Sequence, residues 1–155
     1  MDYQFLKLIH IISATVLFGT GIGSAFYMLL ANRQSNLPAR YFVVKTVVIA
    51  DWLFTAPAIL IQFISGLLLV ITGGYEFSEN WILLALFLFF FAGACWLPVV
   101  WIQIRMRNQL KTAVDDNADL PPSYSKFDFW WVLLGSLAFP AMILIFYLMI
   151  MKPEF

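Results

Sequence analysis

Four long apolar stretches constrain this chain more than any other feature of its sequence. They cover roughly residues 5–31, 41–71, 81–104 and 127–151, and short polar segments separate them. An α-helix needs about 20 apolar residues to cross the hydrocarbon core of a bilayer. Each stretch is long enough, so we expect an all-α fold, a polytopic membrane four-helix bundle that forms one transmembrane domain over residues 1–155. Short connections favour an up-and-down order of the helices.

The composition supports a membrane location and excludes several other classes of protein. Hydrophobic residues make up 63% of the chain and charged residues 12%, whereas soluble domains are about half apolar and a quarter charged. The formal net charge is zero, so nothing indicates nucleic-acid binding. A single cysteine, Cys95, excludes a disulfide within the chain. The expected environment is therefore a lipid bilayer.

The basic residues predict how the helices are oriented in the membrane. Those that flank the first and third loops are Arg33, Arg40, Lys45, Arg105, Arg107, Lys111 and Lys126. Only Lys7 and Lys152 lie near the opposite ends of the helices. Cytoplasmic loops are enriched in lysine and arginine. We therefore expect the first and third loops in the cytoplasm and both termini on the outer side.

The first apolar stretch contains the only histidine of the chain, His10. It lies about five residues, or about 7 Å, from the outer end of the predicted helix. An ionisable side chain at this place needs a partner or a task. His10 shares a helical stripe with small residues such as Gly21, which would let a flat ligand approach the backbone. Three interpretations stay open: an axial ligand of haem iron, a proton relay, or a hydrogen bond to a neighbouring helix.

A six-coordinate haem needs a second axial ligand, and the sequence offers no second histidine. The fourth apolar stretch runs back toward the outer side, where Met142 or Met149 would approach the level of His10. Methionine is an established axial ligand of haem iron. The alternative is that both methionines only fill space between helices.

The second apolar stretch carries a polar stripe that includes Asp51, Thr55 and Gln62. Lipid cannot satisfy polar side chains, so we expect this stripe to face the interior of the bundle. It predicts a proton or polar path, with hydrogen bonding inside the bundle as the purely structural alternative. By helical rise, positions 62–66 lie level with His10. We therefore expect His10 and Asp51 to occupy separate sites, and Pro57 to kink the helix between them.

Three further features of the sequence indicate helix packing or binding at the membrane surface. Gly19 and Gly23 form a GxxxG motif, which is typical of helix packing and is compatible with a homodimer. Arg105 and Arg107 would hold an anionic headgroup or act as anchors at the cytoplasmic surface. We interpret Cys95 as a packing residue of the third helix.

The chain as a whole resembles a family of predicted bacterial integral membrane proteins of unknown function. The resemblance rests on residues 6–14 (LKLIHIISA), 18–21 (FGTG), 50–57 (ADWLFTAP) and 93–101 (GACWLPVVW). It implies a multi-pass protein of a bacterial inner membrane. The first helix is also distantly similar to HemJ-type protoporphyrinogen oxidases and to CopD-like proteins. In the HemJ-type enzymes the corresponding histidine belongs to a haem site, which implies this role for His10.

Two hypotheses for function follow, and whether the chain is an enzyme stays open. The first is a membrane redox protein that binds haem b, with His10 as an axial ligand to the iron and Asp51 in a proton path. The second is a non-enzymatic membrane subunit or assembly protein. In that case the polar residues and the small-residue faces would serve helix packing and contacts with another membrane protein.

Overall fold

The computed structural model describes residues 2–153 and folds them into long helices alone. The first is α1, Tyr3–Asn32. The second apolar stretch forms α2 (Leu37–Ala50), a π-helical segment η1 (Asp51–Thr55) and α3 (Ala56–Gly73) in unbroken succession. α4 covers Asn80–Asp115 and α5 covers Ser123–Met151. The all-α, four-helix membrane fold is thus confirmed, with four helical segments long and apolar enough to span a bilayer.

Local signals in the sequence explain where the helices begin and end. The Asn36 side chain accepts a hydrogen bond from the backbone N–H of Ala39 (3.0 Å), and Pro38 occupies the first turn of α2. Both are favoured at a helix start. After α3, Gly74 adopts a left-handed conformation with φ +71°, which glycine accepts without steric cost.

The third helix is longer than the apolar stretch that predicts it. The apolar stretch ends near residue 104, and α4 continues beyond it for about three turns to Asp115. These added turns carry charged residues, including the salt bridge between Lys111 and Asp115 at 2.6 Å. Side-chain pairs four residues apart support a solvated helix where apolar periodicity is absent. The loop before α5 is correspondingly shorter than expected.

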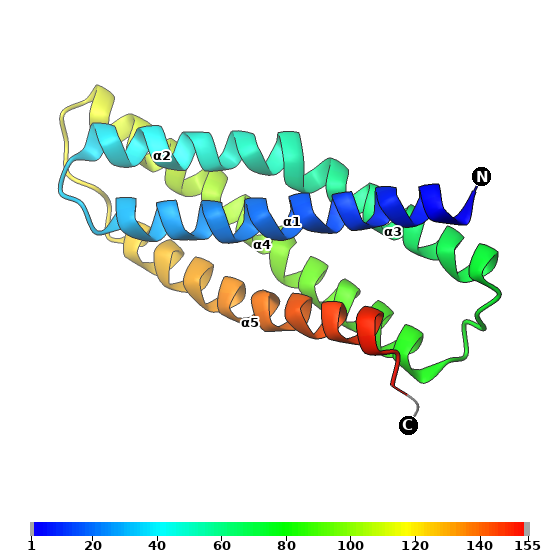
Figure 1. Cartoon of the computed structure of the whole chain (residues 1–155). Helices are drawn as coiled ribbons and strands as arrows, with labels where there is room; N and C mark the ends of the chain where they lie inside the picture. Colours follow the sequence, from blue (N-terminus) through cyan, green and yellow to red (C-terminus); the bar gives the residue numbers. More distant parts are fainter. Residues whose placement is uncertain (1, 154–155) are drawn as a thin grey trace.

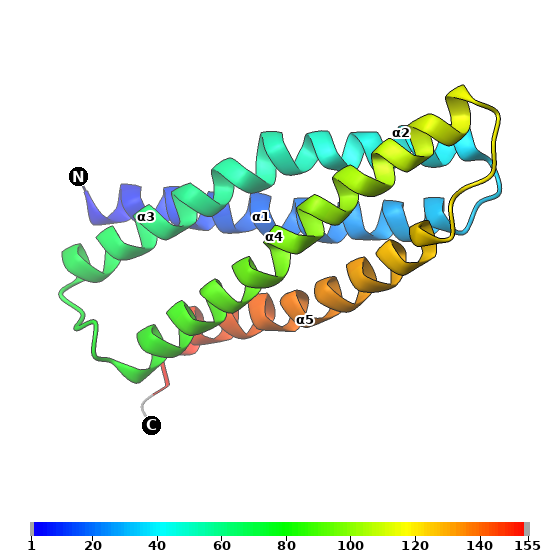
Figure 2. The ribbon, with the colours of Figure 1, turned by 180° about the vertical axis from the view of Figure 1, so that it is seen from behind.

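The helices run antiparallel, so that α1 begins and α5 ends at the same end of the bundle (Figure 1). We call this the terminal end, and the opposite end, with the α1–α2 and α4–α5 connections, the loop end. α1 packs along α2 and α3, while α4 packs along α2 and α5. Viewed from behind, the α1–α3 and α4–α5 pairs diverge toward the terminal end (Figure 2).

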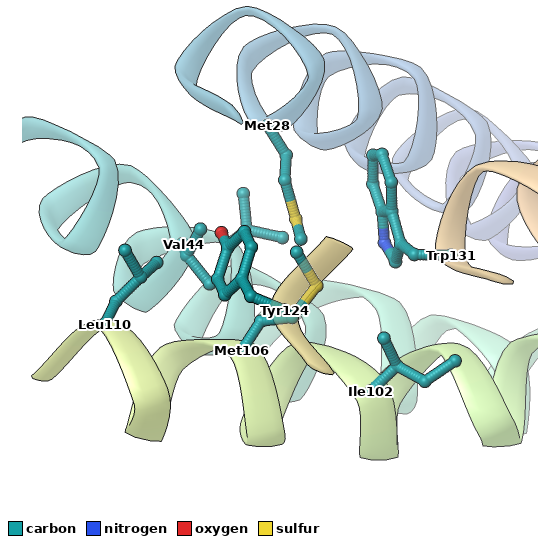
Figure 3. Close-up of a cluster of buried hydrophobic side chains, with 8 residues drawn as sticks. Met28, Val44, Ile102, Met106, Leu110, Tyr124 and Trp131 are labelled. Atoms are coloured by element: carbon teal, nitrogen blue, oxygen red, sulfur yellow. The ribbon is translucent and has the colours of Figure 1, made fainter. Parts of the chain in front are cut away.

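The largest apolar core lies in the half of the bundle near the loop end. Its labelled members come from α1, α2, α4 and α5 and converge on one another (Figure 3): Met28, Val44, Ile102, Met106, Leu110, Tyr124 and Trp131. Met28, Val44, Met106 and Leu110 are almost fully inaccessible. Most other apolar side chains of the helices are exposed, as expected for a surface that faces lipid.

Candidate functional site

Two clusters of polar side chains lie inside the membrane-spanning segments, and the first surrounds His10. We define the histidine cluster as His10 and Ser13 of α1 with Gln62 and Ser65 of α3. His10 Nδ1 lies 2.9 Å from Ser65 Oγ, and His10 Nε2 lies 2.9 Å from Gln62 Nε2. The expectation that positions 62–66 lie level with His10 is thus confirmed.

The remaining hydrogen bonds of the cluster assign the neutral tautomer of His10. Ser65 has one hydroxyl hydrogen and donates it to the carbonyl oxygen of Ile61 at 2.5 Å. It therefore accepts from His10, which places the ring hydrogen on Nδ1. His10 Nε2 then accepts from the Gln62 amide, whose Oε1 accepts from Ser13 Oγ at 2.5 Å. Every polar atom of this network has a partner.

Glycine at position 66 lets the imidazole approach α3 closely. A Cβ atom at Gly66 would lie 3.2 Å from His10 Cε1, closer than ordinary van der Waals contact. The ring is therefore held between two hydrogen bonds and the bare backbone of α3. The interpretation of His10 as a side chain that hydrogen-bonds a neighbouring helix describes this geometry directly.

The second cluster, the aspartate cluster, consists of Asp51 and Thr55 of η1 and Gln103 of α4. All three side chains are buried, with exposed fractions of 5%, 4% and 3%. Thr55 Oγ1 donates to Asp51 Oδ1 at 3.0 Å, and the side-chain amide of Gln103 lies beside the carboxyl group. The other end of that amide, Oε1, is buried without a hydrogen-bond partner.

The π-helical segment sets the position of the aspartate cluster. Pro57 has no backbone N–H, so the carbonyl group one turn earlier loses its usual helical partner. The backbone responds with the wider turn of η1, and the N–H of Ala56 bonds the carbonyl of Asp51, five residues earlier. Such π-turns are rare and occur frequently at functional sites. The turn begins at Asp51 and ends at Thr55, the two members of the cluster from this helix.

The residues that the sequence combined into a haem site come from two helices, α1 and α5. His10 faces α3, whereas Met142 and Met149 lie on α5, and Met149 is 36% exposed. An added Cβ at Gly21 would meet nothing within 4 Å. Axial ligation needs a lone pair on an imidazole nitrogen, but both ring nitrogens of His10 already have partners. A haem iron at His10 would therefore have to displace one of these two hydrogen bonds.

The polar residues also do not form one connected line. Thr55 bonds Asp51, and Gln62 bonds His10 and Ser13. Gln62 lies seven positions after Thr55, which corresponds to about 10 Å along the helix axis. No hydrogen bond joins the two clusters within residues 2–153, and the same part of the chain holds no group of three or more His, Cys, Asp or Glu side chains suited to a metal ion.

Sequence reasoning missed Gln103, although a signal was present. Gln103 is a polar residue inside the apolar part of the third helix, close to its basic end. A second group also escaped notice at the loop end. There Asn32 donates to Asp128 (2.6 Å) and accepts from the Tyr124 hydroxyl (2.7 Å), which ties α1 to α5. The spacing along the chain gives no indication of either pairing, because each one joins different helices.

Comparison with known proteins gives the family. A model described as "Predicted integral membrane protein (DUF2269)" matches residues 4–153. The chain belongs to this family. It is accordingly a multi-pass integral membrane protein with four apolar helical spans. No curated protein and no solved structure matches the chain. The distant similarity to HemJ-type and CopD-like proteins finds no support in these comparisons and stays a prediction, as does haem binding.

Proposed function

We propose that this protein transfers protons across the membrane, with Asp51 and His10 as the proton-exchanging groups. One observation carries the proposal: each of these ionisable side chains meets a glutamine amide. Gln62 faces His10, and Gln103 faces Asp51. Neither has an oppositely charged partner, since the one salt bridge within residues 2–153 joins Lys111 and Asp115.

A glutamine partner differs chemically from a charged partner. An opposite charge favours the ionised form of its neighbour and opposes the gain or loss of a proton. A primary amide has a donor end and an acceptor end. Rotation by half a turn exchanges the two, so the same amide can stabilise either protonation state of the group that it faces.

The histidine cluster contains a ready partner for each state. With neutral His10, Gln62 donates to Nε2 and accepts from Ser13. With charged His10, the reversed amide would accept from Nε2–H and donate to Ser13 Oγ. The Ser13 hydrogen then has a second acceptor within reach, the carbonyl oxygen of His10 at 2.9 Å. No polar atom of the cluster would lose its partner in the exchange.

The aspartate cluster follows the same logic. A carboxylate at Asp51 accepts from the donor end of the Gln103 amide. A carboxylic acid would donate to the acceptor end after reversal of the amide. Burying an isolated charge in a membrane interior is costly, so a buried carboxyl group without a cation partner exchanges protons more readily than it keeps a permanent charge. Transfer between the two clusters requires water or helix movement across the two turns that separate them.

Proton flux into proteoliposomes tests this function. With an encapsulated pH-sensitive dye and a potassium diffusion potential, we expect the wild-type protein to acidify vesicles well above the rate of protein-free vesicles. Asp51→Asn should lower the flux at least tenfold. The matched control is Asp115→Asn, because Asp115 lies on the exposed end of α4, and its flux should equal that of the wild type. A wild-type flux at the background rate, or an undiminished flux in Asp51→Asn, would refute the proposal.

A non-enzymatic membrane subunit is a second candidate, and one observation favours it. A Cβ added at Gly19 or Gly23 would meet nothing within 4 Å, so the GxxxG face of α1 has no close neighbour along these glycines. A second copy of this chain is the occupant that we propose for this face. Gly19→Leu with Gly23→Leu should then convert a dimer into a monomer in mild detergent. An unchanged particle size would rule out this interface.

We further propose a bacterial inner membrane as the location, with both termini outside, on the basis of the basic residues beside the first and third loops. Haem b at His10 stays a separate prediction. Oxidised and reduced visible spectra of the purified protein test it, because bound haem gives a Soret band that His10→Ala would abolish. A colourless protein after haem supplementation would exclude it.

A further inference from the structure

A groove lies on the outside of the bundle between the η1–α3 segment and α4. Its volume is about 410 Å³, within the range of ordinary small-molecule sites. The lining is almost entirely apolar and includes three tryptophans, Trp52, Trp96 and Trp101. We call it the tryptophan groove. It lies beside the aspartate cluster. Trp52 directly follows Asp51, and Ala56 directly follows Thr55.

Trp96 forms part of the groove wall with its ring. Its indole Nε1–H is buried inside the protein and has no hydrogen-bond partner within residues 2–153. An occupant of the groove therefore contacts the apolar ring of Trp96 and not this N–H.

A positive charge lies at one end of the same groove. The guanidinium carbon of Arg105 is 5.1 Å from the centre of the Trp101 ring, which forms part of the lining. Arg105 is exposed and has no carboxylate partner within residues 2–153. Trp101 packs edge-to-face on Phe127 near the start of α5. Tryptophan at such a level is typical of the membrane–water interface, where lipid headgroups lie.

We propose that the tryptophan groove binds one anionic phospholipid from the leaflet at the loop end of the bundle. An acyl chain lies against the apolar lining, which includes the Trp96 ring, and the phosphate pairs with Arg105. Guanidinium groups bind phosphate with directed hydrogen bonds. A neutral isoprenoid quinone would leave Arg105 without a partner, and a zwitterionic lipid would oppose it with a second positive charge. The site is independent of proton transfer.

Native mass spectrometry of the intact protein tests the proposal, with phosphatidylglycerol and phosphatidylcholine of matched chains as the probes. We expect one phosphatidylglycerol to bind at least tenfold more tightly than phosphatidylcholine. Arg105→Gln should abolish this preference. Trp96→Ala removes part of the apolar wall that the acyl chain contacts, so it should weaken the binding of both lipids severalfold. Arg107→Gln is the matched control, because the Arg107 side chain bonds Asn108 at 2.9 Å, and it should behave as the wild type.

Three results would overturn the assignment. One is equal affinity of the wild-type protein for the two lipids. Another is a preference for phosphatidylglycerol that survives in Arg105→Gln while Arg107→Gln abolishes it. The third is a dimer that excludes lipid from the groove, because a second copy would then cover it. Circular dichroism on each variant distinguishes loss of the site from loss of the fold. Asp51→Asn should bind phosphatidylglycerol as tightly as the wild type, which distinguishes this site from the proton pathway.

Discussion

At the scale of single residues, the closest contact of the histidine cluster is with a glycine. His10 Cε1 lies 3.2 Å from the place that a Cβ of residue 66 would occupy. The imidazole also donates from Nδ1 to Ser65 and accepts at Nε2 from Gln62, and these two hydrogen bonds oppose a movement of the ring away from position 66. The geometry of His10 therefore depends on a residue that makes no polar contact with it.

Gly66→Ala should consequently destabilise the protein. Overpacking costs about 1–3 kcal/mol, while alanine gains about 0.5–1 kcal/mol over glycine inside a helix, so we expect a net loss of about 1 kcal/mol. Gly93→Ala is the control, because the added Cβ meets nothing within 4 Å, and it should be neutral or slightly stabilising. Thermal unfolding in mild detergent compares the two. Equal melting temperatures would mean that the His10 imidazole moves aside for the added methyl group without a cost in stability.

The hydroxyl group of Tyr75, in the connection between α3 and α4, should ionise at a lower pH than an ordinary tyrosine. The Lys152 ammonium donates to its hydroxyl and lies over its ring, and this hydrogen bond lowers the pKa of Tyr75 below the ordinary value of about 10. The contact therefore stabilises the folded state most when the pH is above that ordinary pKa. This stabilisation is lost as the pH falls through the lowered pKa. Ultraviolet titration should show one early tyrosinate, which disappears in Tyr75→Phe and shifts upward in Lys152→Met. An unchanged titration in Lys152→Met would contradict this cause.

At the scale of elements, the sequence predicts the helices well and their pairing poorly. Apolar runs longer than a bilayer crossing leave little choice but helix, and helical rise alone brings positions 62–66 level with His10. The π-turn of η1 is harder to foresee, because Pro57 predicts a disturbed helix but not its form. The contact between Gln103 and Asp51 depends on which helices are neighbours in space, and no pattern along the chain encodes that.

The pairing of α1 with α3 rests in part on Gln62, and Gln62→Leu should weaken it. The change leaves His10 Nε2 without its donor, while Ser13 keeps the His10 carbonyl oxygen as an acceptor. One unsatisfied buried group costs about 1–3 kcal/mol. Thr15→Val is the control, since its hydroxyl bonds only Ile11 of its own helix (2.9 Å), and it should change stability by less than about 0.5 kcal/mol. A similar unfolding free energy for both variants would show that the cluster does not hold the helices together.

At the scale of the whole molecule, the loop end and the terminal end differ in charge. Basic residues gather beside the α1–α2 and α4–α5 connections, which predicts a cytoplasmic loop end. In a variant with Cys95→Ala, a single cysteine at Ser78 should react with an impermeant maleimide added to intact cells. A cysteine at Ser35 should react only after lysis. The reverse pattern would invert the orientation.

The central claim is that Asp51 binds and releases a proton beside a glutamine amide. Infrared difference spectroscopy over a pH titration measures this directly in the reconstituted protein. We expect a carboxylic acid band that converts to a carboxylate band, is absent in Asp51→Asn and shifts in frequency in Gln103→Leu. The absence of any pH-dependent band that Asp51→Asn removes would contradict the account, because Asp51 would then keep one protonation state and transfer nothing.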